Sequence, residues 1–227
     1  SDSEVYQAFD LAYDYDIWPL WQAVVQGKVP AIRYLEMLRF QEAIYPQNYV
    51  KMRCVENHDN PRIMRLAPSP AQAQAWTAFA AFNKGAFLIY GGQEAAAVHT
   101  PSLFDIDKVQ WNDYPLQPFL TKLAQLKKDP ALAEGKLTLL ESEPAIQAAW
   151  EYPGNSLYGV FNTGGKRGQV KVQLPDGAYP ELLSGSTLQV RKGKAPLPES
   201  AAIVRYSAPV SLKRVYCELL DYAYRPE

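Results

Sequence analysis

The pattern of apolar runs changes near residue 130, and this change constrains the fold more than any other feature. Before it, short apolar runs alternate with amphipathic segments of helical length, a pattern typical of parallel β/α units. After it, short strand-like runs are separated by frequent turn sequences, which is typical of an antiparallel sandwich. The sequence therefore predicts an α/β region at residues 1–130 and an all-β sandwich at residues 131–227.

The first region contains one helix whose start is clearly marked. Ser69 is a good N-cap, Pro70 suits the first helical position, and Gln72 follows Ser69 by three residues, as a capping box requires. Gly85 is expected to end this helix, and the apolar run at 86–90 is expected to be a parallel strand buried on both faces. The other expected strands are residues 8–13 and 50–55, and the other expected helices are residues 18–26, 32–44 and 118–128, the last stopped by Pro130.

In the second region, Gly, Pro, Asn and Asp supply turn sequences between the runs. Seven strands are predicted there, at residues 136–141, 145–151, 156–161, 168–174, 187–190, 202–206 and 212–219.

Charge and cysteine content exclude several classes of protein. The chain has 23 Lys and Arg against 24 Asp and Glu, a net charge of −1, so no nucleic-acid partner is expected. No segment approaches the roughly 20 apolar residues of a membrane helix, so no membrane partner is expected either. Cys54 and Cys217 lie far apart, and with two histidines they exclude a disulfide framework and a zinc site of the usual spacing. The compartment stays open, since residues 1–4 show no targeting signal.

The densest polar cluster, Glu56-Asn57-His58-Asp59-Asn60, directly follows the expected strand at 50–55. In parallel α/β sheets and barrels, side chains at the carboxyl ends of strands face the ligand cleft. Gln93 and Glu94 follow the next expected strand, and we expect them to reach toward the same cleft. Taken alone, a His-Asp pair favours an ordinary solvent-exposed turn over a binding site.

Other polar and aromatic residues are expected to have structural roles. Asp14 and Asp16 follow the first strand and are predicted to lie in a solvent-exposed loop. Trp18 and Trp21 could stack on sugar rings, but helix packing is the favoured interpretation. Cys54 is expected to be a small buried side chain. No role is assigned to His99.

Two of these segments resemble motifs of one known family. Residues 55–62, Val-Glu-Asn-His-Asp-Asn-Pro-Arg, resemble the seventh-strand motif of the α-amylase family of retaining glycoside hydrolases. Residues 85–94 resemble that family's eighth-strand signature, and residues 9–15 are similar to its sixth strand. Phe104 and Trp111 fall where members carry a Phe and a Trp before the last barrel helix. The order and separation of the motifs favour a site over an exposed turn.

The resemblance implies a fold and a set of roles. The chain would form a partial (β/α)8 TIM barrel, the last three β/α units, followed by the family's carboxyl-terminal antiparallel β sandwich. Asp59 would be the active-site acid that stabilises the transition state, and His58 would donate to hydroxyls of the same sugar. Arg62 is assigned to substrate binding on the same basis, and Asn57 and Glu94 are assigned to it because they follow the expected strands at the same cleft.

The resemblance also shows what this chain lacks. In the family, the nucleophile and the general acid come from the fourth and fifth strands, and no residue here matches either position. We therefore expect the isolated chain to be inactive. The complete protein would cleave α-glucosidic bonds in α-glucan or related α-glucosides by a retaining mechanism. No cofactor or metal is expected in this chain, because the family's calcium usually lies in an inserted domain outside it.

Two alternatives to hydrolysis remain open. One is a transglycosylase or isomerase of the same family, such as a branching enzyme or trehalose synthase. The other is a non-catalytic carbohydrate-binding or scaffold protein. A physical expectation is independent of this choice: a barrel without its other strands has open sheet edges at residues 8–13 and 86–90, which favours self-association.

Overall fold

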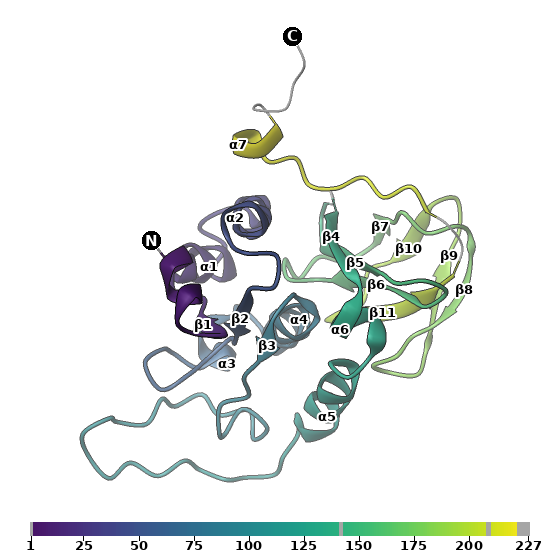
Figure 1. Ribbon diagram of the computed structural model, residues 1–227. Coiled ribbons are helices and arrows are strands. Elements are labelled where there is room, and N and C mark those ends of the chain that lie inside the picture. Colours follow the sequence, from purple (N-terminus) through teal and green to yellow (C-terminus); the bar gives the residue numbers. More distant parts are fainter. Residues whose placement is uncertain (1, 141–142, 208–209, 222–227) are drawn as a thin grey trace.

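The computed structural model describes residues 2–140, 143–207 and 210–221. A parallel three-stranded sheet has the order β1-β2-β3, with Leu11 opposite Val50 and Met52 opposite Ala86. Helices lie between and after these strands (Figure 1). The elements of this region are η1 (Asp2–Gln7), β1 (Leu11–Tyr13), α1 (Trp18–Val25), α2 (Ala31–Ile44), β2 (Val50–Arg53), α3 (Ile63–Leu66), α4 (Pro70–Phe82), β3 (Ala86–Phe87), α5 (Gln117–Leu126) and α6 (Pro130–Glu134).

An antiparallel β domain follows α6. Its main sheet has the strand order β11-β6-β5-β4, and two further ribbons pair β10 with β7 and β8 with β9. A short last helix lies beside α2 (Figure 1). The elements are β4 (Lys136–Leu140), β5 (Ile146–Glu151), β6 (Ser156–Phe161), β7 (Gln169–Lys171), β8 (Gly177–Pro180), β9 (Thr187–Val190), β10 (Lys194–Pro196), β11 (Ala201–Tyr206) and α7 (Glu218–Asp221). The predicted class, parallel β/α units followed by antiparallel strands, is confirmed.

The cap predicted for α4 is present. The Ser69 hydroxyl oxygen accepts the Gln72 N–H at 3.2 Å and donates to the Gln72 side-chain oxygen at 3.0 Å. This exchange satisfies one of the free N–H groups at the helix start. The helix then places its large side chains in the core, where Trp76, Phe79 and Phe82 are almost fully buried.

One hydrophobic core crosses the boundary between the two regions. The rings of Phe79 and Phe82 on α4 lie 5.2 and 5.3 Å from the ring of Phe161 on β6. The Trp150 indole N–H on β5 also donates to the Phe82 carbonyl at 2.6 Å, next to the end of α4. The β domain therefore packs directly on α4, and a second cluster of buried side chains fills its own interior.

Two details of the first region differ from the sequence-based expectations. The run at 86–90 is not buried on both faces: Ala86 is exposed and Ile89 is 40% exposed, because β3 pairs with β2 alone in the described sheet. Pro130 does not stop the preceding helix, which ends at Leu126. It instead starts α6 at the first helical position, where its missing N–H costs nothing.

The role of Gly85 also differs from the expectation. Helix α4 ends at Phe82, before this glycine. Gly85 has a φ of +122°, and a Cβ there would lie 2.1 Å from the Lys51 carbonyl oxygen. Glycine is therefore needed for close backbone contact between β2 and the start of β3.

In the β domain, a strand predicted at 212–219 is wrong. Arg214 makes one isolated bridge to Leu140, and the segment ends in α7. Two short strands, β8 and β10, were missed because turn residues border or lie within them. None of the described helices is both long and apolar enough to span a membrane.

Candidate active site

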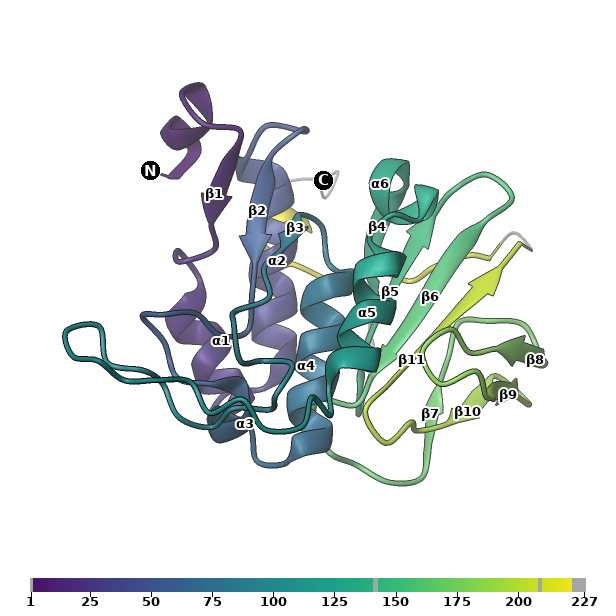
Figure 2. The same ribbon diagram turned by 90° about the horizontal axis from the view of Figure 1, so that it is seen from below.

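The polar cluster predicted after β2 forms a tight turn at the carboxyl end of that strand. Figure 2 shows β1 and β2 side by side, with their carboxyl ends directed toward α1, α3 and the long loop before α5. Buried Asn57 organises the turn: its Oδ1 accepts the Asp59 N–H at 3.0 Å and the Asn60 side-chain amide at 2.9 Å. This turn leaves His58 and Asp59 at the surface, with 51% and 48% of their side chains exposed.

The carboxylate of Asp59 has two neighbours within the described chain. Its Oδ2 lies 3.4 Å from Nε2 of His58 and accepts a hydrogen bond from the Tyr15 hydroxyl at 3.2 Å. The same hydroxyl accepts the side-chain amide of Asn57 at 2.9 Å. Burial, and then the nearby Asp59 carboxylate, raise the pKa of Tyr15 above its ordinary value. The structure thus brings Asn57, His58 and Asp59 together, and it adds Tyr15 from the end of β1.

Arg62 lies beneath this turn with no exposed side-chain surface. Its Nη1 lies 2.7 Å from Glu56 Oε1, and its other nitrogens donate to the carbonyls of Gly91 and His99. The second oxygen of Glu56 accepts the Ile63 N–H at 2.8 Å. Burial raises the pKa of Glu56, although these hydrogen bonds oppose the shift. Arg62 therefore joins the turn after β2 to the turn after β3 without reaching the surface.

Glu94 lies in the turn after β3. Its carboxylate accepts the Gly92 N–H at 2.9 Å, and its charge is one of the causes that raise the pKa of Glu56. The neighbouring Gln93 is buried, and neither polar atom of its side chain has a hydrogen-bond partner among the described residues. The turn therefore lies close to the Glu56–Arg62 pair, and Gln93 is buried within it.

Asp59 also lines a surface hollow of about 500 Å³. Other polar side chains in its wall come from Gln26, Arg65 and Thr100, so helices and loops beside the site contribute to it. A larger groove of about 1110 Å³ lies away from this site, between the amino ends of β2 and β3 and the β domain. The polar turn and the smaller hollow, rather than the larger groove, coincide with the predicted site.

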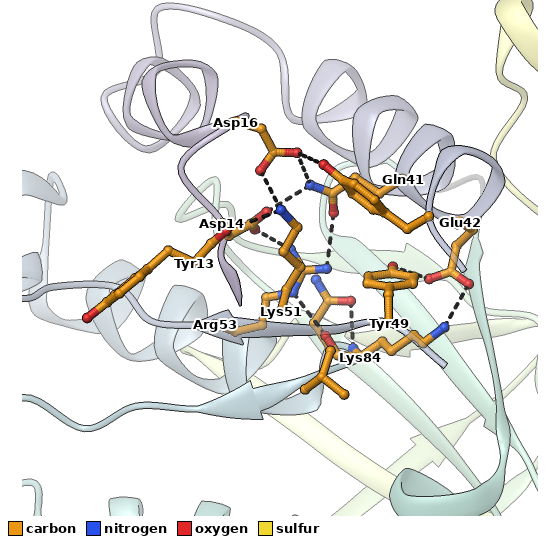
Figure 3. Close-up of polar contacts among 12 residues, drawn as sticks. Tyr13, Asp14, Asp16, Gln41, Glu42, Tyr49, Lys51, Arg53 and Lys84 are labelled. Carbon is orange, nitrogen blue, oxygen red and sulfur yellow. Dashed lines mark hydrogen bonds and ion pairs between the residues drawn. The ribbon is translucent and has the colours of Figure 1, made fainter. Parts of the chain in front are cut away.

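The prediction of a solvent-exposed loop is wrong for Asp14 but holds for Asp16, which is exposed although it is ion-paired. Asp14 is buried and pairs with Arg53, while Asp16 lies 3.1 Å from Lys51 (Figure 3). The side-chain amide of Gln41 donates to both acids, at 2.8 and 2.9 Å. Lys51 and Arg53, two cations on β2, therefore each pair with one acid of the loop after β1. This network joins β1, β2 and α2 next to the site.

The remaining minor predictions have clear outcomes. Trp18 and Trp21 are buried and pack with their ring centroids 4.5 Å apart, so the packing interpretation is confirmed. Cys54 is buried as predicted, and burial raises the pKa of its thiol to about 12. His99 had no assigned role, and its Nε2 lies 2.7 Å from Oδ2 of Asp107 in the loop before α5.

The side chains that could ligate a metal ion are dispersed over residues 2–140, 143–207 and 210–221. Within those ranges, no three His, Cys, Asp or Glu side chains gather closely enough to hold a metal ion. The absence of a metal site from this chain stays a prediction.

Comparison with known proteins places the chain. The family described as the bacterial alpha-amylase C-terminal domain matches residues 136–204. An α-amylase from Lactobacillus plantarum is 36% identical over 91% of this chain and 49% of its own, with a TM-score of 0.81. The chain belongs to the α-amylase family. It corresponds to the carboxyl-terminal part of its relatives, as the sequence motifs predicted, and no curated protein sequence matches it.

Two further structures share the fold. A maltogenic α-amylase from Thermotoga neapolitana is 24% identical, with a TM-score of 0.80, and the match covers 92% of this chain and 53% of that one. An α-amylase from Geobacillus thermoleovorans, complexed with acarbose, is 20% identical, with a TM-score of 0.65, over 90% of this chain and 51% of that one. The chain therefore spans about half the length of the α-amylases it matches.

Proposed function

We propose that this chain is the substrate-gripping part of an α-amylase-type glycoside hydrolase, and that Asp59 stabilises the transition state. The observation that supports this most is the placement of Asp59: a half-exposed carboxylate on a rigid turn at the carboxyl end of a parallel strand. Ligand sites of barrels lie at that end. The proposed substrates are α-glucans and related α-glucosides, a class supported by the acarbose complex of the Geobacillus relative.

The proposed mechanism uses the charge of Asp59. Retaining glycosidases pass through a transition state in which positive charge develops on the sugar ring. An ionised carboxylate held beside that ring interacts more strongly with the transition state than with the substrate, which lowers the barrier. His58, 3.4 Å from the Asp59 carboxylate, would donate a hydrogen bond to a hydroxyl of the same sugar.

The nucleophile and the general acid of this proposal lie outside the 227 residues. Glu56 is unsuited to either role because both its oxygens accept hydrogen bonds, one from Arg62 and one from the Ile63 N–H. The residue is also only 1% exposed. Glu94 is engaged by the Gly92 N–H. Asn57 and Arg62 would then contribute by holding the two turns in place, and Asp59 and His58 by contacting the sugar.

The test is the substitution Asp59→Asn in the longer enzyme that contains this chain. It keeps the shape of the side chain but removes its charge, so kcat should fall by at least roughly 10²–10³. His58→Ala should raise KM. Asp113→Asn, at an exposed acid in the loop before α5, is the matched control and should leave kcat unchanged. A kcat within a few-fold of wild type for Asp59→Asn would show that the turn has a structural role only.

A further inference from the structure

Tyr15 connects two loops that meet at the candidate site. It follows β1, whereas Asn57 and Asp59 follow β2, more than forty residues later in the chain. Its hydroxyl lies 2.9 Å from the Asn57 amide nitrogen and 3.2 Å from Oδ2 of Asp59. One side chain therefore contacts both the residue that organises the turn and the acid proposed to act on the sugar.

The direction of these hydrogen bonds is fixed by the surroundings. Oδ1 of Asn57 accepts two N–H groups, from the Asp59 backbone and the Asn60 side chain, so the amide cannot be turned around. Its Nδ2 must then donate to the Tyr15 oxygen. The Tyr15 hydroxyl, which has a single proton, is left to donate to the carboxylate of Asp59.

The ring that carries this hydroxyl is also held in place. The ring of Tyr13 stacks on it, with centroids 4.9 Å apart and planes 21° apart. Buried Trp18 meets it edge-on at 6.0 Å. Contacts of this kind limit the rotation of an aromatic side chain, so the hydroxyl has a defined position relative to the end of β2.

The two oxygens of Asp59 consequently have different surroundings. Oδ2 accepts the Tyr15 hydroxyl and lies near His58. Oδ1 has no hydrogen-bond partner among the residues that the structure describes, which leaves it available to a ligand. We propose that Tyr15 is a positioning residue, which holds Asp59 by Oδ2 so that Oδ1 is presented to the sugar. This inference rests on the proposed function of Asp59.

The hydrogen bond from Tyr15 is useful because the carboxylate of an aspartate can otherwise rotate. The terminal torsion of an aspartate has a broad, roughly two-fold distribution, and 48% of the Asp59 side chain is exposed. A group that must meet a developing charge works best when it is already oriented, because reorientation then costs nothing during the reaction. Tyr15 supplies that orientation through the hydrogen bond from its hydroxyl to Oδ2 of Asp59.

The experiment is Tyr15→Phe in the longer enzyme, with Tyr13→Phe as the matched control. Tyr13 is the stacked neighbour, and its hydroxyl makes no hydrogen bond to a described residue. We expect Tyr15→Phe to lower kcat about tenfold with little change in KM, as for the loss of one hydrogen bond to a charged group. Tyr13→Phe should stay within about twofold of wild type, and both variants should melt within a few degrees of it.

The double variant Tyr15→Phe/Asp59→Asn shows whether Tyr15 acts through Asp59. If it does, the double variant should be no slower than Asp59→Asn alone, because the group being positioned is already lost. The inference would be overturned if the kcat losses of Tyr15→Phe and Asp59→Asn multiplied in the double variant. It would also be overturned if Tyr15→Phe and Tyr13→Phe lowered kcat equally. If Asp59→Asn itself leaves kcat unchanged, the proposed function fails instead. If only Tyr15→Phe is silent, the positioning role alone fails.

Discussion

Nη1 of Arg62 lies 2.7 Å from Oε1 of Glu56, and neither side chain has more than 1% of its surface exposed. Burial removes the hydration of both charges, and the attraction between the partners offsets part of that cost. Removing one partner would therefore leave the other charge buried and uncompensated. Here the partners are supplemented by the Gly91 and His99 carbonyls and by the Ile63 N–H. The pair therefore holds the turns after β2 and β3 together beneath the candidate site.

The first prediction removes one side of that pair. Arg62→Met should leave the Glu56 carboxylate buried without its counter-charge and lower the free energy of unfolding by about 3–5 kcal/mol. Denaturant unfolding of the 227-residue chain measures this. Arg33→Met is the control, since Arg33 is 63% exposed and pairs with Glu36 at the surface, and it should cost less than about 1 kcal/mol. Equal losses for the two variants would contradict a structural role for the buried pair.

The second prediction concerns Lys127 and pH. Burial, together with the nearby Arg53 guanidinium, lowers the pKa of Lys127 from an ordinary 10.5 to about 8. Between these two values the unfolded chain binds more protons than the folded one, so this group makes folding more favourable as pH rises. Relative to Lys127→Met, wild type should gain about 1–2 kcal/mol of unfolding free energy from pH 8 to 9.5.

The matched control for this pH effect is the next residue. Lys128 is exposed, so Lys128→Met should keep the pH dependence of wild type. Working below pH 10 limits the ionisation of the many tyrosines in the unfolded chain, and the comparison with Lys127→Met at each pH cancels what remains. Parallel stability curves for wild type and Lys127→Met would show that the Lys127 ammonium is not destabilised in the folded state.

The third prediction concerns activity. Retaining hydrolysis requires two carboxyl groups about 5 Å apart, one as nucleophile and one as acid, and the available glutamates of the site are engaged by protein groups. The isolated 227-residue chain should therefore not release the aryl group of an aryl α-glucoside above the uncatalysed rate. Turnover that persisted in purified wild type and disappeared in Glu94→Gln would show that this site carries its own acid.

The fourth prediction concerns association. In the described sheet β1 and β3 are the two outer strands, and apolar side chains near β1 are exposed: Phe9 is 65% and Leu11 41% exposed. Outer strands with apolar neighbours favour pairing with other chains, so the purified chain should sediment as oligomers. Leu11→Lys should raise the proportion of monomer. A stable wild-type monomer of 25.5 kDa with cooperative melting would contradict this prediction.

The sequence by itself determined the local features of this protein. The cap at Ser69, the start of α4 at Pro70 and the turn at Asn57–Asn60 depend on residues three positions apart, and the printed order of residues shows them. The alternation of apolar runs likewise predicted parallel units followed by antiparallel strands. The family motif placed Asp59 and His58 at the end of a strand, because that position depends only on where the strand stops.

Only the tertiary structure decided which distant groups meet. Asp14 pairs with Arg53 thirty-nine residues away, and Tyr15 reaches Asp59 forty-four residues away. Both contacts depend on the register of β1 against β2, which sets Leu11 opposite Val50 and is not visible in either strand alone. The pairing of the two strands decides which residues are buried and which side chains lie opposite one another. For this reason Asp14, which was expected in solvent, is buried beside Arg53, and Tyr15 lies within hydrogen-bond distance of Asp59.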